Sequence, residues 1–268
     1  MSFGLLIVGD EILSGKREDK HLAKVIELLA ARGLALAWAR YVGDDPARIT
    51  AELKTAFAGS DIVFSCGGIG ATPDDHTRQC AAAALGVPLA LHPEARDLVL
   101  ERMRDVAREQ NTPYQPDRED NRHRLNMALF PEGAGIVPNP YNKIAGFWLA
   151  RGAATVYFMP GFPVMAWPMI EWTLDTRHAD LHRARGVSER SVIVFGAMEA
   201  ALTPLMEQVE QRFAGIKVFS LPSVDHPQFG RHIELGVKGE AGRLAPAYDA
   251  LLAGLRSHGA SLGPEMVR

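Results

Sequence analysis

The chain has 268 residues, of which 47% are apolar and 23% are charged. This is an ordinary globular composition, and it excludes a disordered, collagen-like or fibrous protein. The length suits one large domain or two smaller ones. Because 29 basic residues face 32 acidic ones, the net charge of -3 supplies no overall positive field, and we expect no nucleic-acid partner.

Cysteine content and the pattern of apolar residues indicate the cellular location of the protein. Cys66 and Cys80 are too few for a disulfide framework or a four-thiolate zinc site. The first apolar run is short and ends at Asp10 and Glu11, which predicts a strand and not a signal peptide. No apolar stretch approaches the roughly 18 residues of a membrane helix. We therefore expect a cytoplasmic protein without a membrane partner.

The first 70 residues alternate between strand and helix patterns. Asp19 and Asp45 are placed to cap two helices, and Pro46 suits a first helical position. The elements predicted here are strands at 5–8, 34–42 and 61–66, and helices at 20–32 and 46–58. Such alternation is typical of a mostly parallel sheet with right-handed crossovers.

The remainder of the first 185 residues is less regular. Thr72 and Pro73 predict the cap and first residue of a helix that runs to residue 85. Further predictions are helices at 93–110 and 164–184, a polar bridge at 111–124, paired strands at 136–137 and 146–149, and a strand at 154–158. Asn139 to Asn142 form the turn between the paired strands by their composition.

The tail predicts a separate β-α-β-β-α unit. Its expected strands are 191–195, 216–220 and 232–237, and its expected helices are 198–213 and 244–258. We therefore divide the chain into residues 1–170 and residues 186–262. The predicted fold class is α/β for the first part and small α+β for the second.

Two clusters of glycine and acid follow the first and third predicted strands. The first is Gly9 to Lys16, with Asp10 and Glu11, but it is not a phosphate-binding P-loop. Five residues separate its glycines, and Arg17 stands where a magnesium-binding hydroxyl is needed. The carboxyl ends of parallel strands share one edge of a sheet, so we expect the two clusters to meet there.

The second cluster contains Gly67, Gly68 and Gly70, followed by Thr72, Asp74 and Asp75. Pro73 breaks the dinucleotide fingerprint at the position of its third glycine. Glycines let backbone N–H groups approach a ligand, and a helix start attracts phosphate. The alternative is a capped helix start in which the glycines only make a turn.

Two further groups are candidates for ligand contact. Asp10, Glu11, Asp74 and Asp75 offer hard oxygen ligands for Mg²⁺ or Mn²⁺, or else form a solvated acidic rim. Asn139, Lys143 and Gly146 lie in a polar segment that would bind a ligand headgroup or phosphate, or else form a plain β-turn.

The order and spacing of several motifs resemble a known family. They are Gly9–Gly15, Gly67–Thr77, Pro131–Ala134, Asn139-Pro140 and Pro160–Pro163. Residues 1 to about 170 resemble the MoaB/Mog molybdopterin-binding domain, and more closely the N-terminal part of the CinA (competence/damage-inducible protein A) family. The tail is more loosely similar to a KH-like module. The resemblance implies a three-layer α/β/α domain with a mixed, mainly parallel sheet. The chain departs from the family pattern at His21, residues 142–145 and Met165.

The resemblance also implies a function. Family members bind a pterin or nucleotide, and several resemble pyrophosphatases that cleave ADP-ribose or FAD with a divalent metal. By that resemblance Asp10, Glu11 and Asp75 are catalytic and hold Mg²⁺, Mn²⁺ or Co²⁺ together with Asp74. The expected contacts with a phosphorylated ligand come from Gly67, Gly68, Gly70, Thr72, Asn139, Lys143 and Gly146. The alternative is a non-catalytic molybdopterin or nucleotide carrier. Family members form dimers or trimers, so a homo-oligomer is expected.

Overall fold

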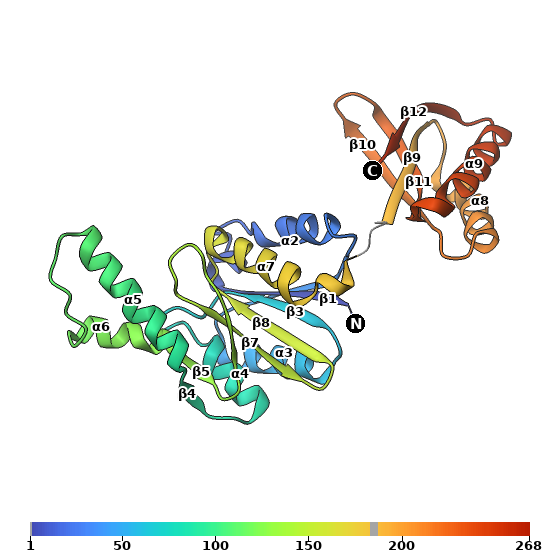
Figure 1. The fold of residues 1–268 in the computed structure, drawn as a ribbon. Helices are drawn as coiled ribbons and strands as arrows, with labels where there is room; N and C mark the ends of the chain where they lie inside the picture. The colour runs from blue at the N-terminus through green and yellow to red at the C-terminus, as the bar shows by residue number, and fades with distance from the viewer. Residues whose placement is uncertain (1, 183–186) are drawn as a thin grey trace. The chain divides into compact units, whose positions relative to one another are not determined.

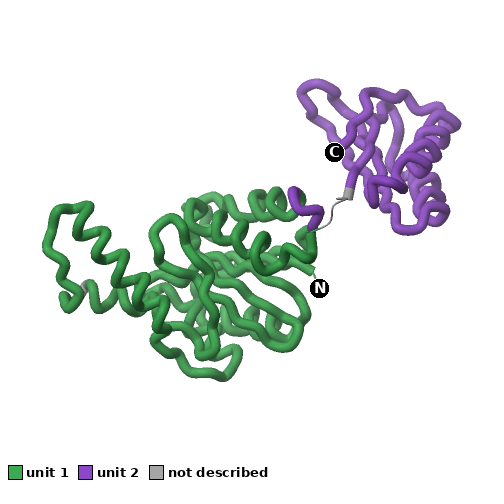
Figure 2. The backbone as a smooth tube through the Cα atoms, viewed as in Figure 1, with its two compact units in different colours: residues 1–30, 35–182 green, residues 31–34, 183–268 purple. Residues whose placement is uncertain are grey.

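A computed structural model describes residues 2–182 and 187–268. They form two compact units (Figure 2), and each is treated by itself below. The first holds residues 2–30 and 35–182, and the second holds residues 187–268 with the short segment 31–34. Among the residues described, no helix combines the length and apolar character needed to span a membrane.

The first unit is built on a six-stranded sheet in the order β2-β1-β3-β8-β7-β6. Its strands are β1 (Phe3–Val8), β2 (Leu36–Val42), β3 (Ile62–Cys66), β8 (Ala154–Met159), β7 (Gly146–Arg151) and β6 (Gly135–Val137). The first four are parallel, and β7 and β6 run antiparallel to their neighbours. The expected mixed, mainly parallel sheet is confirmed.

Helices cover both faces of this sheet (Figure 1). They are α1 (Asp10–Leu13), α2 (His21–Ala30), α3 (Pro46–Ala58), α4 (Thr77–Leu85) and α7 (Pro163–Arg177), followed by the 3₁₀ turn η2 (Ala179–Leu181). On one face α2 packs with α7, and on the other α3 packs with α4. The predicted caps are confirmed, because the Asp19 carboxylate accepts the N–H of His21 at 2.8 Å and that of Asp45 accepts the N–H of Arg48 at 2.7 Å.

A helical excursion leaves the sheet between α4 and β6. It comprises β4 (Leu89–Leu91), α5 (Pro93–Glu109), α6 (Glu119–Arg124), η1 (Leu125–Ala128) and β5 (Leu129–Pro131). Antiparallel pairing of β4 with β5 closes it. Both strands are three residues long, too short for alternation to reveal them. Stacked rings join its end to the sheet: the centroids of Phe130 and Phe147 lie 4.7 Å apart, and those of Phe147 and Phe158 lie 4.4 Å apart.

The start of α4 differs from the prediction. The helix begins at Thr77 and not at Thr72. The N–H and hydroxyl of Thr72 both donate to Asp75 Oδ2, at 2.8 and 2.6 Å, while the Asp75 N–H donates to the Thr72 carbonyl at 3.0 Å. These bonds close a separate turn over residues 72–75, so the Thr72 hydroxyl does not cap the helix.

The second unit is an antiparallel sheet in the order β10-β11-β9-β12, with two helices. Its elements are β9 (Val187–Phe195), α8 (Glu199–Arg212), β10 (Lys217–His226), β11 (Gly230–Glu240), α9 (Ala241–Ser257) and β12 (Ser261–Val267). The core lies between the sheet and helices, around Leu205, Leu235 and Leu251. The expected α+β unit is present. The KH-like description did not anticipate β12, which completes a split β-α-β order.

The limits of the two units also differ from the predicted ones. The first extends beyond residue 170 because α7 continues to Arg177 and packs on α2. The second extends past residue 262 because β12 pairs with β9. The predicted helix at 164–184 ends at Arg177, and its last two positions lie outside the described residues.

Candidate functional site

A cavity of about 780 Å³ opens where the parallel strands end. Four strands deliver loops to this edge: β1 to Gly9, β2 to Asp44, β3 to Gly67 and β8 to Pro160, and all four residues line the cavity. The loops are tied together, since the Gly9 N–H donates to the Val42 carbonyl at 3.0 Å. Residues of the helical excursion line the cavity as well. The cavity thus lies at the edge of the sheet where the sequence placed the two acidic clusters.

The glycine loop, residues 67–71, lies along one wall. Gly67 has φ 114° and Gly68 has φ 68°, a region that side chains rarely adopt. Neither has room for a methyl group, because a Cβ would overlap the Val8 carbonyl oxygen at Gly67 and Thr77 Oγ1 at Gly68. Glycine is therefore required at both positions.

The first two residues of α4 bind all four carbonyls of residues 67–70. The Thr77 hydroxyl donates to the Gly67 carbonyl, and its N–H donates to the Gly68 carbonyl, both at 3.0 Å. The Arg78 guanidinium donates to the carbonyls of Ile69 and Gly70, the latter at 2.6 Å. Arg78 is only 3% exposed, and burial lowers the pKa of its guanidinium while Asp75 opposes that shift. All four carbonyls of the loop are thus held by α4, while the Gly67 N–H donates to the Met159 carbonyl at 2.9 Å.

This anchoring fixes where the amides of the loop point. In a planar trans peptide the N–H points opposite to the preceding carbonyl. Carbonyls 67–70 face α4, so the N–H groups of residues 68–71 point away from it. In the described part of the chain, no acceptor is bonded to these four N–H groups, and all four residues line the cavity. A run of unengaged amides of this kind is an anion site.

Four acidic residues line the same cavity, and three of them, Glu11, Asp44 and Asp74, form what we call its acidic rim. The pKa of Asp44 is raised, mainly by burial and further by the negative charges of Asp10, Glu11 and Asp74, against a bond from the Asp10 N–H. The pKa of the exposed Asp74 is lowered, first by the Thr72 hydroxyl. The negative charges of the rim therefore face one another.

Asp10 and Asp75 are placed differently from the expectation. Asp10 does not line the cavity; its Oδ1 accepts the N–H of Asp44 at 3.2 Å, and its own N–H donates to Asp44 Oδ2 at 2.9 Å. Asp75 lines the cavity, but its Oδ2 is engaged by Thr72. These two carboxylates shape the loops.

The expected four-acid metal set is not assembled. Within residues 2–182 and 187–268, no three His, Cys, Asp or Glu side chains are grouped to hold a metal ion. Asp10 and Asp75 are turned to backbone N–H groups, so the residues do not fit a resident divalent metal held by the protein alone. Mg²⁺ is commonly bound by one or two carboxylates together with substrate phosphates, and the acidic rim suits an ion that arrives in that way.

The third predicted group lies outside the cavity lining. Lys143 has φ 67°, and its Nζ pairs with Glu101 at 2.5 Å and with Asp105 at 2.7 Å. These partners, Asp105 first, raise the pKa of Lys143. Asn139 is buried, and its side chain donates to Asn142 Oδ1 at 2.8 Å and to the Ile144 carbonyl at 2.9 Å.

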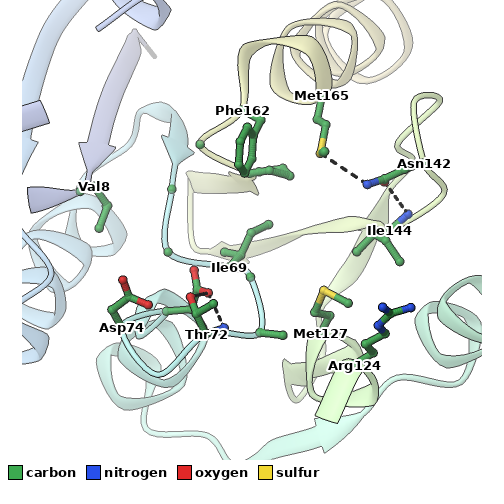
Figure 3. A pocket seen from close by; sticks show the side chains of 18 of the residues that line it. Val8, Ile69, Thr72, Asp74, Arg124, Met127, Asn142, Ile144, Phe162 and Met165 are labelled. Carbon is green, nitrogen blue, oxygen red and sulfur yellow. Dashed lines mark hydrogen bonds between the residues drawn. The ribbon is translucent and has the colours of Figure 1, made fainter. Parts of the chain in front are cut away.

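Gly146 lies in β7, where a Cβ would overlap the Phe158 carbonyl. Asn139, Lys143 and Gly146 therefore maintain the turn and the sheet and do not line this cavity, and their contact with a ligand stays a prediction. Their neighbours Asn142 and Ile144 line the cavity instead (Figure 3).

Sequence patterns did not reveal several residues that build or line the site. Asp44 follows the carboxyl end of β2, so the rule that singled out the other two loops would have found it. Arg78 is the only charged residue of α4, which is a weak signal. Arg102 and Arg124 come from α5 and α6 and had no signal, because nothing local shows that the excursion returns to the cavity.

Comparisons with known proteins show the family of the chain. A family model described as a probable molybdopterin binding domain matches residues 4–179. A CinA-like protein of Syntrophotalea carbinolica is 31% identical over 220 residues, covering 80% of this chain and 51% of that protein. One from Citrifermentans bemidjiense is 34% identical over 207 residues, covering 77% and 47%. The chain thus spans about half the length of these curated relatives.

A solved structure is also similar. The crystal structure of the protein CinA, of unknown function, from Thermoplasma acidophilum aligns with a TM-score of 0.54 and 25% sequence identity. The alignment covers 65% of this chain and 96% of that one.

Proposed function

Because this chain belongs to the probable molybdopterin binding domain family, we propose that it binds a phosphorylated pterin or nucleotide and hydrolyses a pyrophosphate bond, as in ADP-ribose or FAD. One observation carries the proposal: the four unengaged amides of residues 68–71 line a cavity and cannot turn away, since α4 holds their carbonyls. Preorganised amides bind phosphate without a cost of reorganisation at the moment of reaction.

Different lining residues have different roles in the proposed hydrolysis. The amides hold a phosphate, and Arg17, which also lines the cavity, adds positive charge. A divalent cation that arrived with the substrate would be held by the acidic rim, and it would neutralise negative charge on the phosphates. A rim carboxylate accepts a proton as water attacks one phosphorus. The bridging P–O bond breaks, and two phosphomonoesters leave. With ADP-ribose these are AMP and ribose 5-phosphate.

The test is turnover by the purified protein. ADP-ribose, FAD and ADP are each supplied with Mg²⁺, Mn²⁺ or Co²⁺, and products are followed by ³¹P NMR. We expect ADP-ribose or FAD to be cleaved and Glu11→Gln to lower kcat by about 10²-fold or more. Glu27→Gln, on the exposed surface of α2, is the control that should leave the rate unchanged. Absence of turnover in every combination would refute hydrolysis.

A non-catalytic carrier is the second candidate. It is favoured by the finding that no described group of three acids or histidines forms a cation site in advance of the ligand. A carrier predicts saturable binding and an unaltered ligand. Mass spectrometry of the recovered ligand separates the two candidates.

A further inference from the structure

We propose that the end of the cavity formed by α5, α6 and η1 binds a planar heteroaromatic ring and that Arg124 recognises that ring. We call this end the ring slot; it consists of Val99, Met103, Val106, Arg124 and Met127. The inference rests on the proposed function, in which the glycine loop takes the phosphates. It adds the residue that distinguishes a ring-bearing ligand from phosphate alone.

The floor of the ring slot is apolar and fixed. Val99, Met103 and Val106 are spaced four and three residues apart, so they share one face of α5. Val99 is 1% and Met103 is 4% exposed, and both belong to the main hydrophobic core. Met127 in η1 packs against the same core. This surface thus keeps its shape when a ligand is absent.

Two guanidinium groups from the excursion line the cavity, and they differ in their partners. Arg102 is engaged by Glu109, with Nη1 2.7 Å from Oε1. Arg124 has no hydrogen-bond or ion-pair partner in the described part of the chain. It lies three residues before Met127, at helical spacing. The planar donor group of Arg124 is therefore available at the apolar floor.

The cavity has two chemically different ends (Figure 3). Arg124 and Met127 lie at one end, and Thr72 and Asp74 lie at the other. Phosphate loses hydration in apolar surroundings, and in the proposed function it is bound by the amides of the glycine loop. A purine, pterin or flavin ring has apolar faces that suit methionine sulfur and polar edges that a guanidinium can bind or stack upon. The ring slot fits the ring and not the phosphate.

The test compares two arginines on α6 with two probes. Affinities for ADP and for inorganic pyrophosphate, each with Mg²⁺, are measured by calorimetry on wild type, Arg124→Gln and Arg122→Gln. Arg122 is exposed and does not line the cavity, so it is the matched control. We expect Arg124→Gln to weaken ADP by about tenfold and pyrophosphate by less than about twofold. Arg122→Gln should change neither affinity.

Each alternative result has a distinct meaning. If Arg124→Gln weakens the affinities for ADP and pyrophosphate equally, Arg124 contacts phosphate and not the ring. If it weakens neither affinity, Arg124 has no role in binding. Either result overturns this inference and leaves the proposed function standing. A wild-type protein that binds neither probe would overturn the proposed function, and the inference with it.

Arg124→Lys separates a planar contact from simple charge. Lysine keeps the positive charge but lacks the planar fork. We expect Arg124→Lys to remain at least about fivefold weaker for ADP than wild type. Full recovery of ADP affinity by lysine would refute ring recognition by the guanidinium.

Discussion

The loops after β1 and β3 begin from the same pattern, a glycine followed by acids, yet they play different parts. After β1, Asp10 binds the Asp44 N–H of the next loop, and of the two acids Asp10 and Glu11 it is Glu11 that lines the cavity. After β3, four carbonyls are bound by α4, and the N–H groups of residues 68–71, which line the cavity, have no acceptor among the described residues. The loop after β3 is anchored by donors that bind its carbonyls, whereas the loop after β1 is tied to the end of β2 and the loop after it by the Asp10 side chain and by the N–H groups of Gly9 and Asp10.

The difference comes from the neighbouring element and not from the loop sequence. The loop after β1 meets another strand end, which offers an N–H. The loop after β3 meets Thr77 and the buried Arg78, which offer several donors to carbonyls. Because the N–H of a trans peptide points opposite to its carbonyl, donors that bind the carbonyls on one side of a loop leave the N–H groups pointing to the other side. Four pairs of variants test this contrast, taken here from the largest expected effect to the smallest.

The first pair is Gly68→Ala and Gly15→Ala. Both glycines have positive φ, 68° and 72°, but only at Gly68 would a Cβ overlap another group, Thr77 Oγ1. In chemical denaturation, Gly68→Ala should lower the free energy of unfolding by about 3 kcal/mol, and Gly15→Ala should lower it by about 1 kcal/mol. Similar losses for both variants would show that the two loops are equally constrained.

The second pair is Arg78→Met and Gln79→Met on α4. Removing the guanidinium leaves the carbonyls of Ile69 and Gly70 without their donor. We expect Arg78→Met to lower the free energy of unfolding by about 2 kcal/mol and to weaken pyrophosphate binding. Gln79 is exposed and should be neutral. If Arg78→Met keeps wild-type pyrophosphate affinity, the carbonyl anchoring does not orient the amides.

The third pair is Thr72→Val and Ser14→Ala, a hydroxyl from each loop. The Thr72 hydroxyl donates to Asp75 Oδ2 at 2.6 Å, and its loss should cost about 1 kcal/mol. The pKa of Asp74, which this hydroxyl holds down, should rise toward its ordinary value in NMR titrations. The Ser14 hydroxyl has no hydrogen-bond partner among the residues described, so Ser14→Ala serves as the control. If the pKa of Asp74 is the same in Thr72→Val as in wild type, the Thr72 hydroxyl does not lower it.

The fourth variant is Asp44→Asn, with Asp45→Asn beside it. Because the folded-state pKa of Asp44 is raised, wild type loses stability as pH climbs from the unfolded pKa near 3.9 through the folded value. Asparagine removes that loss and still accepts the Asp10 N–H. We expect Asp44→Asn to gain a few tenths of a kcal/mol above this window.

Asp45 caps α3, so its replacement by asparagine, another good cap, should have little effect. A pH dependence of stability that Asp44→Asn leaves unchanged would contradict the raised pKa of Asp44.

Local sequence was sufficient for the framework. The apolar runs at residues 5–8 and 61–66, with caps at Asp19 and Asp45, predicted the parallel strands and their helices. The rule that strand carboxyl ends share an edge then placed the glycine loop and Glu11 at one cavity. These features follow from the spacing of apolar residues and from helix capping, and both depend on residues that are neighbours in sequence.

Tertiary structure alone decided which side chains reach the cavity. Lys143 was expected at the ligand and instead pairs with Glu101 and Asp105, which lie about 40 positions earlier in the chain. Arg124 reaches the cavity only because the excursion returns beside the sheet. A side chain turns toward whichever charge or donor lies nearest in space. For Lys143 those partners belong to a distant segment of the chain, and for Arg124 the cavity itself is lined by segments remote in sequence; no local pattern can specify either.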